Sequence, residues 1–420
     1  MASIRKRGKN YQITVSNGRD IHDKQILETI TWTPDPEKTD KQNEKDLQKF
    51  ALDFEERVKN GKCLKGRKMT YLEYSKLWMD QYSSSQMEDT SYETTESYLR
   101  LHILPAIGHI RLSELQPLHI IKLYNKMADE GYMRNGKHME YSQSTIKRVH
   151  QIINSSLNTA VQWQLIERNP CERAKPPKSA KIQKDNYFTL EQTKAFFAQL
   201  DKPYSVPHGG RLPKDGVRHY DIKSFELKYK VLLYMAVFGG FRRGELVSLT
   251  WDDIDLDNGT VNITKSTART KQHGNITKAP KNRNSIRKIV LPDFVMSMLK
   301  EYKDQQDNYR AALGDYWEGD NYIFIQNDGQ RIDLSTPNKI VKKVIRIYNA
   351  EHEDKLPDIT LHGLRHTSAT LLISQNVDVK TVSRRLGHAE TSTTMNIYAH
   401  ALEKRDTVAS DSLGALFKEK

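Results

Sequence analysis

The sequence predicts an α+β protein that is mainly α, with a small N-terminal β-sheet domain, a helical domain, and a mixed, mostly helical domain that contains a small antiparallel sheet. Three observations lead to this prediction: strand-like alternation near the N-terminus, sustained helical spacing in the middle, and helices mixed with short strands in the rest. The chain has 420 residues, and a domain commonly holds about 150, so two or three domains are expected. Apolar residues make up 37% of the chain and charged residues 28%, which allows packed cores.

The first predicted domain, residues 1 to 65, is a small sheet with one helix. In YQITV, residues 11 to 15, apolar side chains alternate with polar ones, as in a half-buried strand. The Asn-Gly pair that follows predicts a turn into a second strand-like run at residues 26 to 33. A charged stretch with helical spacing then extends over residues 40 to 60.

A helical domain is predicted from residue 70 to residue 170. Residues 71 to 167 look wholly helical, because apolar residues recur at the spacing of amphipathic helices, punctuated by Pro105, Gly108 and Gly136. A basic linker is predicted over residues 171 to 187. The surrounding RNPCERAKPPKSAKIQKDN combines three prolines with six basic residues against two acidic ones, which is typical of a connecting segment.

The third predicted domain spans residues 188 to 420. It opens with TLEQ, residues 189 to 192, a capping box whose Thr and Gln side chains can satisfy each other's backbone amides. An apolar helix is expected at residues 227 to 238. Strands are expected around the turn Asn258-Gly259, with a returning strand at residues 287 to 291.

The chain carries 66 Lys and Arg residues against 53 Asp and Glu, a formal charge of +13. Basic grooves that neutralise phosphates release counterions, so this excess favours a polyanionic partner. An anionic membrane surface is the alternative. No apolar run approaches the roughly 18 residues of a membrane span, and the basic start has no apolar stretch behind it, so we expect neither a transmembrane helix nor a secretory signal.

The two cysteines, Cys63 and Cys171, lie far apart and have no CxxC spacing. This argues against a disulfide framework and against a zinc ribbon. A reducing cytosol is therefore the expected compartment.

Two local signals are basic. Arg242 lies in GGFRRGEL, at a predicted turn between apolar helices whose glycines would let the backbone approach a ligand; the alternative is a solvated Arg that caps a helix. Between Lys265 and Lys288 there are eight basic residues and no acidic one, spread over a loop that joins two strands. As a mobile hairpin this loop could lie against phosphates, although a solvated surface position is the expected one for any single lysine in it.

Two further signals lie near the C-terminus. In LHGLRHTSATLLI, a helix would place His362 on one face with either Arg365 or His366. The two histidines have the spacing of a zinc pair, but the Glu of an HExxH motif is missing and no third ligand is nearby. In DVKTVSRRLGHAETSTTMNIYAH, we expect a helix that an Asp caps and that Gly387 ends. Tyr398 follows it and could be a reactive residue or a packing residue.

Together, these signals match the needs of phosphoryl transfer. An attacked phosphodiester develops charge on its nonbridging oxygens, and guanidiniums offer paired donors that stay charged at pH 7. A tyrosine hydroxyl can attack phosphorus and form a covalent ester, which conserves the bond energy for religation.

The pattern resembles the tyrosine recombinases, the phage-integrase family of site-specific recombinases. The family signature has an Arg in a G-x-R-x-G-E turn, a Lys in a β-hairpin, His-x-x-Arg, a His or Trp after Leu-Gly, and a nucleophilic Tyr about ten residues later. The matching residues are Arg242 with its neighbour Glu245, Lys281 in PKNRNSIRKIVLP, His362 and Arg365, His388 in LGH, and Tyr398. Lys278 and Arg283 are basic neighbours of Lys281.

The resemblance extends over nearly the whole chain, and it is to integrases of conjugative transposons and Gram-positive phages. It implies an arm-type DNA-binding domain at residues 1 to 65, a core-binding domain at 70 to 170, and a catalytic domain with a C-terminal tail at 188 to 420. By this resemblance the protein would be bacterial, cytoplasmic and associated with the nucleoid.

The resemblance also implies a mechanism that integrates and excises a mobile element. Tyr398 would attack the scissile phosphate to give a 3′-phosphotyrosine and a free 5′-hydroxyl, with no cofactor and no metal. By the same resemblance, Arg242 and Arg365 would hold the nonbridging oxygens, and Lys281 would protonate the leaving group. His362 would assist proton transfer at the nucleophile. His388 would donate to a phosphate oxygen, and Glu245 would orient the pocket.

Two duplexes and two exchanges per duplex imply a homo-tetramer on double-stranded DNA, with a possible accessory excision factor. The apolar tail after Tyr398 would dock on a neighbouring protomer or on its own domain. Three other classes of DNA-acting protein share some of these features. A type IB topoisomerase would lack the arm-like N-terminus, a metal-dependent nuclease would need dispersed carboxylates, and a non-catalytic DNA-binding regulator of the same fold would lack part of the residue set.

Overall fold

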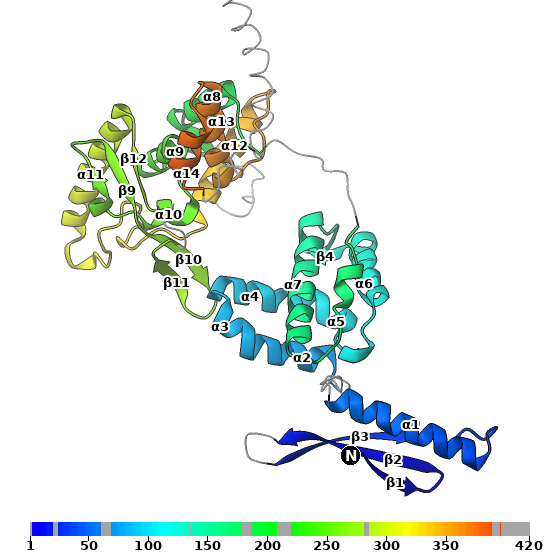
Figure 1. Cartoon of the computed structure of the whole chain (residues 1–420). Coiled ribbons are helices and arrows are strands. Elements are labelled where there is room, and N and C mark those ends of the chain that lie inside the picture. Colours follow the sequence, from blue (N-terminus) through cyan, green and yellow to red (C-terminus); the bar gives the residue numbers. More distant parts are fainter. Residues whose placement is uncertain are drawn as a thin grey trace, which may run out of the picture. The chain divides into compact units, whose positions relative to one another are not determined.

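The computed structural model shows a mostly helical chain with small antiparallel sheets (Figure 1), which confirms the predicted class. The chain divides into two compact units, Met1–Lys181 and Ile182–Lys420, and this division falls inside the segment predicted as a linker. None of the described helices combines the length and the apolar character that crossing a membrane requires. The described residues are 2–19, 24–59, 69–134, 136–177, 186–207, 220–280, 285–388 and Met395.

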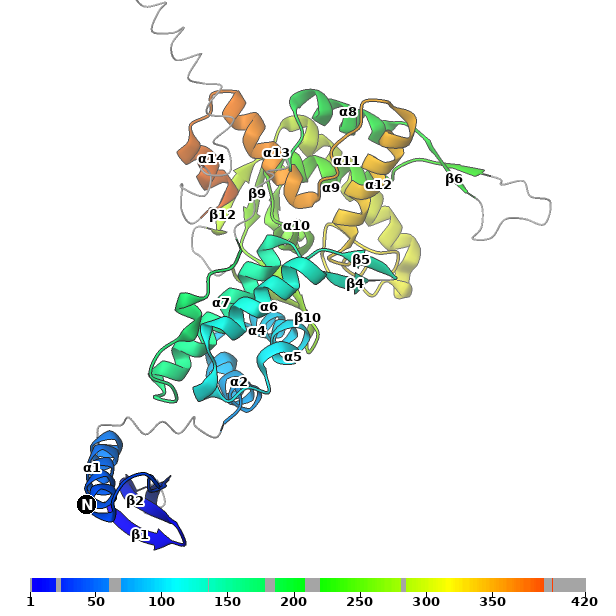
Figure 2. The same cartoon turned by 90° about the vertical axis from the view of Figure 1, so that its right-hand side faces the viewer.

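The N-terminal part of the first unit is a three-stranded antiparallel sheet with strand order β1-β2-β3. Its elements are β1 (Ser3–Arg7), β2 (Asn10–Arg19), β3 (Gln25–Trp32) and α1 (Asp40–Lys59). Ile13 and Val15, both on the inward face of β2, form a small core with Leu47, Phe54 and Val58 of α1. The apolar residues of the predicted polar and apolar alternation therefore lie on the face of the sheet that α1 covers (Figure 2).

The rest of the first unit is a helical bundle with its own core. Its main helices are α2 (Tyr71–Trp78), α4 (Asp89–Tyr98), α5 (Leu104–Ile107), α6 (Pro117–Glu130) and α7 (Gln143–Gln162), with the short α3 (Ser84–Gln86). Buried aromatic residues of α2 are bonded to α7: the Tyr71 hydroxyl lies 2.8 Å from Ser156 Oγ, and Trp78 Nε1 donates to Thr159 Oγ1 at 3.2 Å. These bonds satisfy the polar ends of large core side chains.

The prediction that residues 71 to 167 are wholly helical is wrong at one place. A short hairpin, β4 (Tyr132–Arg134) and β5 (Lys137–Met139), interrupts the bundle. Gly136 has a φ of +74°, and tight hairpin turns need such positive φ values, which glycine adopts without strain.

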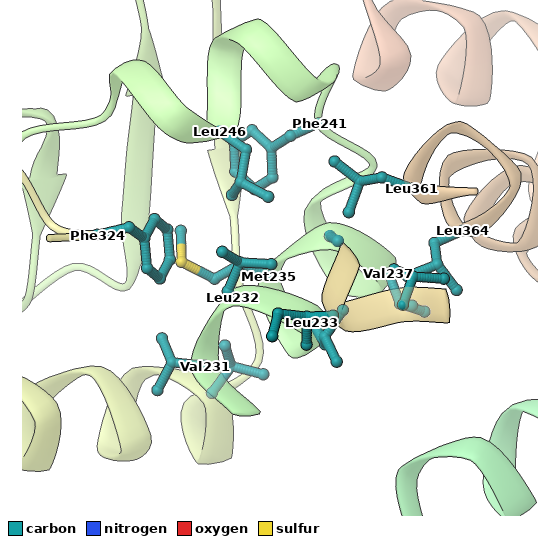
Figure 3. Packing of buried hydrophobic residues seen from close by; sticks show 14 of the residues in the cluster. Val231, Leu232, Leu233, Met235, Val237, Phe241, Leu246, Phe324, Leu361 and Leu364 are labelled. Atoms are coloured by element: carbon teal, nitrogen blue, oxygen red, sulfur yellow. The ribbon is translucent and has the colours of Figure 1, made fainter. Parts of the chain in front are cut away.

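The second unit is built around α9. Its helices are α8 (Leu190–Asp201), α9 (Leu227–Gly239), α10 (Arg243–Ser248), α11 (Asp293–Leu313), α12 (Thr336–Glu351), α13 (Leu361–Ser374) and α14 (Val379–Leu386). Helix α9 is apolar on nearly all sides and packs in the centre of the core with residues of α10 and α13, among them Leu246 and Leu364 (Figure 3). The predicted capping box at the start of α8 is confirmed, since Thr189 Oγ1 accepts the backbone N–H of Gln192 at 3.2 Å.

The small sheet of this unit has strand order β12-β9-β8. Its strands are β8 (Ile254–Asp255), β9 (Thr260–Ile263) and β12 (Arg287–Val290), and Gly259 supplies the predicted turn with a φ of +64°. A further pair, β6 (Tyr204–Pro207) and β7 (Tyr220–Lys223), projects from the chain between α8 and α9 (Figure 2).

The basic segment after β9, predicted as a loop that could form a hairpin, contains such a hairpin. Strands β10 (Ser266–Thr270) and β11 (Gly274–Lys278) pair in antiparallel fashion. The hydroxyls of Thr267 and Thr277 lie 2.8 Å apart, and Arg331 donates to both. These polar side-chain bonds connect the two strands in addition to their backbone ladder.

Candidate active site

Arg242 lies at the junction between α9 and α10. Gly240 is the C-cap of helix α9 and has a φ of +62°, and a Cβ on this residue would lie 2.6 Å from Leu386 Cδ2. Arg242 then precedes α10 as its N-cap, and its backbone N–H donates to Glu245 Oε2 at 2.9 Å. The glycine therefore permits both the left-handed turn and the close approach that bring Arg242 beside α14.

Glu245 is a buried carboxylate that binds two arginines. It is 2% exposed and accepts a bond from the Arg242 guanidinium at 2.8 Å. Arg287, at the start of β12, donates to both carboxylate oxygens, at 3.1 and 2.9 Å. Burial alone would raise the pKa of Glu245, but the bonds and the charge of Arg287, with those from Arg242, outweigh it and hold the pKa below its ordinary value.

Arg365 is the most deeply buried arginine of the predicted set. It lies on α13 and is 1% exposed. Its guanidinium donates to the carbonyl oxygens of Gly240 at 2.7 Å and of Leu386 at 2.6 Å. One side chain thus connects the end of α9 with the end of α14.

Helix α14 ends in a tight turn that places His388. As predicted, the Asp378 side chain caps the start of the helix and Gly387, with a φ of +66°, ends it. The N–H of Gly387 donates to the Arg384 carbonyl at 3.0 Å, and the N–H of His388 donates to the Ser383 carbonyl at 3.1 Å. This pair of bonds is a Schellman motif, and it explains the Leu-Gly-His sequence locally.

Three consecutive carbonyls at this turn each accept a bond from a different arginine. A helix C-terminus carries partial negative charge, so guanidiniums are favourable there. The three elements that carry these arginines, β12, α13 and the start of α10, therefore meet at one point. The bonds are Arg287 Nε to the Arg385 oxygen at 2.7 Å, Arg365 to the Leu386 oxygen at 2.6 Å, and Arg242 to the Gly387 oxygen at 2.6 Å.

Three imidazoles lie against these arginines. His362 and His366 of α13 have ring centroids 4.5 Å apart and nearly perpendicular planes. Burial, and then the charges of Arg365 and Arg242, lower the pKa of His388 to about 4. Burial, His362 and Arg365 lower the pKa of His366 to about 4, and the pKa of His362 is lowered by partial burial, Arg365 and Arg242. All three rings are thus neutral near pH 7.

The structure brings four of the six predicted residues into one site: Arg242, His362, Arg365 and His388. Lys281, Tyr398 and the tail lie outside the described residues. Sequence reasoning counted Arg287 only among the eight basic residues between Lys265 and Lys288, because nothing near it in the sequence shows that it binds the carboxylate of Glu245. It had treated His366 only as one half of a zinc pair. Within the described ranges, no three His, Cys, Asp or Glu residues are grouped so that they could hold a metal ion.

The arrangement is suited to an anion with several oxygens. The side chain of Arg242 is 37% exposed, and Glu245 and Gly387 hold its guanidinium. Neutral imidazoles add groups that each have one donor and one acceptor nitrogen. Fixed donors of this kind stabilise charge that develops on phosphate oxygens.

Comparison with known families identifies the chain. A family model described as "Phage integrase family" matches residues 217–405, and one described as "Phage integrase, N-terminal SAM-like domain" matches residues 70–128. The chain belongs to the phage integrase family. It is therefore a site-specific DNA recombinase of the tyrosine recombinase class, as the sequence predicted.

Individual relatives agree with this assignment. The chain is 26% identical to a "Tyrosine recombinase XerC-like" protein of Caldanaerobacter subterraneus subsp. tengcongensis over 98% of both chains. It is 29% identical to the ICEBs1 integrase of Bacillus subtilis over 67% of this chain and 68% of that one. It is 24% identical to the transposase of transposon Tn916 from Enterococcus faecalis over 84% of this chain and 80% of that one.

Among solved structures, the fold is similar to the integrase of transposon Tn1549 in complex with a circular intermediate DNA. The TM-score is 0.64 at 18% identity, and the match covers 82% of this chain and 99% of that chain. A lambda integrase dimer bound to a core site matches with a TM-score of 0.52 at 15% identity, over 78% of this chain and 95% of that chain.

The lowered histidine pKa values predict how stability depends on pH. His366 and His388 stay neutral in the folded chain down to about pH 4, whereas an unfolded imidazole takes up a proton near pH 6.5. The unfolded state therefore binds more protons between these values, and the free energy of unfolding falls as the pH is lowered from about 7 to 4.

Urea unfolding at several pH values measures this effect. A His366→Gln/His388→Gln variant lacks the two groups, so its free energy of unfolding should decline less steeply over this window than that of the wild type, while the carboxylates contribute equally to both. Parallel curves for the two proteins would show that these rings have ordinary pKa values.

Proposed function

We propose that the recombinase integrates and excises a mobile element by cutting and rejoining double-stranded DNA through a 3′-phosphotyrosine intermediate. The observation that supports this most is the convergence of Arg242, Arg365 and neutral imidazoles at the end of α14. Relatives named as an integrase and a transposase make a mobile element the expected substrate.

In the proposed cleavage step, the phenolic oxygen of Tyr398 attacks the scissile phosphorus. The new bond joins this oxygen to phosphorus, and the bond from phosphorus to the 5′-oxygen breaks. Lys281 gives its proton to the departing 5′-oxygen. In the rejoining step, a 5′-hydroxyl of the partner duplex attacks the phosphotyrosine and releases Tyr398, so the energy of the ester is conserved.

Arg242 and Arg365 hold the nonbridging oxygens in this proposal. Each is already fixed by protein carbonyls, Arg242 by Gly387 and Arg365 by Gly240 and Leu386. Because the guanidiniums are held before the substrate arrives, little reorganisation is needed when charge develops. Side chains then neutralise the phosphate, and the proposed reaction requires neither a cofactor nor a metal.

The histidines act as neutral groups. His362, with its lowered pKa, can accept the proton of the attacking Tyr398 near pH 7. His388 follows the fixed turn at Gly387, and its ring N–H is proposed to donate to a phosphate oxygen. Glu245 does not react; it orients Arg242.

The other domains carry DNA binding in this proposal. Residues 1 to 65 would bind arm-type sites, residues 70 to 170 would bind the core site, residues 171 to 187 would link the two parts, and residues 188 to 420 would catalyse. Two duplexes with two exchanges each require four protomers, so a homo-tetramer on DNA is proposed. An accessory excision factor and a cytoplasmic, nucleoid-associated location belong to the same proposal.

The nucleophile is tested by Tyr398→Phe, which removes one oxygen and changes little else. On suicide substrates that carry the element ends, with EDTA present, the wild type should form an adduct that survives SDS, because the ester is covalent. The Phe variant should bind the same DNA and form no adduct. Tyr316→Phe, at a residue 82% exposed in the same unit, is the matched control and should react as the wild type does. An adduct with the Tyr398→Phe protein would refute the assignment.

The general acid is tested by Lys281→Ala with two substrates. On a normal duplex the variant should cleave about 100-fold or more slowly, with little loss of DNA affinity. A substrate with sulfur at the bridging 5′-position should restore the rate, since a thiolate leaves without protonation. Lys278→Ala is the control: if sulfur rescues it and not Lys281→Ala, the acid lies three residues earlier. Weaker binding with an unchanged rate at saturation would make Lys281 a backbone contact instead.

A further inference from the structure

Arg287 is a buried arginine whose guanidinium donates four hydrogen bonds to protein groups. Its side chain is 6% exposed. Nε donates to the Arg385 carbonyl at 2.7 Å, one terminal nitrogen donates to Glu245 Oε1 at 3.1 Å and to the Ser285 carbonyl at 3.0 Å, and the other donates to Glu245 Oε2 at 2.9 Å. All three nitrogens thus bind protein groups, so this guanidinium is not presented to a substrate.

Both sets of contacts made by Arg287 lead to Arg242. Arg287 binds both carboxylate oxygens of Glu245, and Glu245 in turn accepts hydrogen bonds from the backbone N–H and the guanidinium of Arg242. Arg287 also donates a hydrogen bond to the Arg385 carbonyl in the α14 turn, and in the same turn the Gly387 carbonyl accepts a hydrogen bond from Arg242. Arg242 is therefore fixed from two sides, and Arg287 contacts each side.

Stability alone does not account for an ion pair at this place. A carboxylate and a guanidinium lose hydration when they are buried, and well-packed apolar residues of similar volume are often at least as stabilising. What an apolar pair does not provide is direction. The planar fork of Arg287 binds both oxygens of Glu245 in parallel and so sets the plane of the carboxylate.

We propose that Arg287 is a positioning residue of the recombination reaction, which acts by holding Glu245 and the α14 turn so that Arg242 is oriented for the phosphate. This inference rests on the proposed role of Arg242. Arg287 touches no reacting atom in it. In this proposal its effect on cleavage is exerted through the orientation of Arg242.

The test is a double-mutant comparison of Arg287→Lys with Arg242→Lys. Lysine keeps the charge but cannot reach both oxygens of Glu245 and the Arg385 carbonyl with a fixed fork. Arg287→Lys should slow cleavage of a saturating suicide duplex about 10-fold or more, because small errors in position are costly, with DNA affinity within about 3-fold of the wild type. In a protein that already carries Arg242→Lys, Arg287→Lys should slow cleavage less than about 3-fold further, since the guanidinium that Arg287 positions is already lost.

The control is Arg310→Lys, the same substitution at an exposed arginine of α11 whose guanidinium lies over the ring of Trp317, 5.5 Å from its centroid. It should leave the cleavage rate at saturation unchanged. Glu245→Gln provides a second route to the answer if Arg287→Lys does not fold, and it should show the same lack of additivity with Arg242→Lys.

Three outcomes would overturn the inference. A wild-type rate for Arg287→Lys would show that orientation by this residue is not needed. A double variant slowed by the product of the two single effects would show that Arg287 acts independently of Arg242. If Arg242→Lys itself cleaved at the wild-type rate, Arg242 would lie outside the pocket, and the proposed function would lose this residue together with the inference.

Discussion

The C-terminal turn of α14 is the point on which the second unit depends, because three neighbouring carbonyls there bind guanidiniums from three different elements. Arginines at such short range would repel one another in isolation. The partial negative charge of a helix end and the buried carboxylate of Glu245 offset this repulsion. Residues more than 100 positions apart in the chain are thereby held in one site.

The same clustering of positive charge sets the state of the histidines. Burial and the neighbouring guanidiniums keep the rings of His362, His366 and His388 neutral, so that each retains an acceptor nitrogen near pH 7. In the proposed reaction, a site built in this way would supply permanent cations for the phosphate and uncharged groups for the protons. The division follows from the environment of each side chain, since guanidiniums do not titrate in this range and imidazoles do.

Local signals in the sequence predicted much of the fold and most of the described site. The capping box at Thr189, the turn at Gly259 and the helix end at Gly387 are decided by a few neighbouring residues, and the structure confirms them. The β10–β11 hairpin was predicted only as a loop that could form a hairpin, because its side-chain bonds come from the Thr267–Thr277 pair and the distant Arg331. Arg287 was missed for a similar reason: its contacts with Glu245 exist only once β12 and α10 pack together.

The central claim is that Arg242 and Arg365, held at the α14 turn, form the phosphate site of a tyrosine recombinase. A crystal structure of the full chain joined to a suicide core-site duplex tests this most directly. It should show the covalent bond at Tyr398, with nonbridging oxygens within hydrogen-bond distance of Arg242 and Arg365, and Arg287 still bound to Glu245. A scissile phosphate linked to another residue, or lying away from both guanidiniums, would contradict the account.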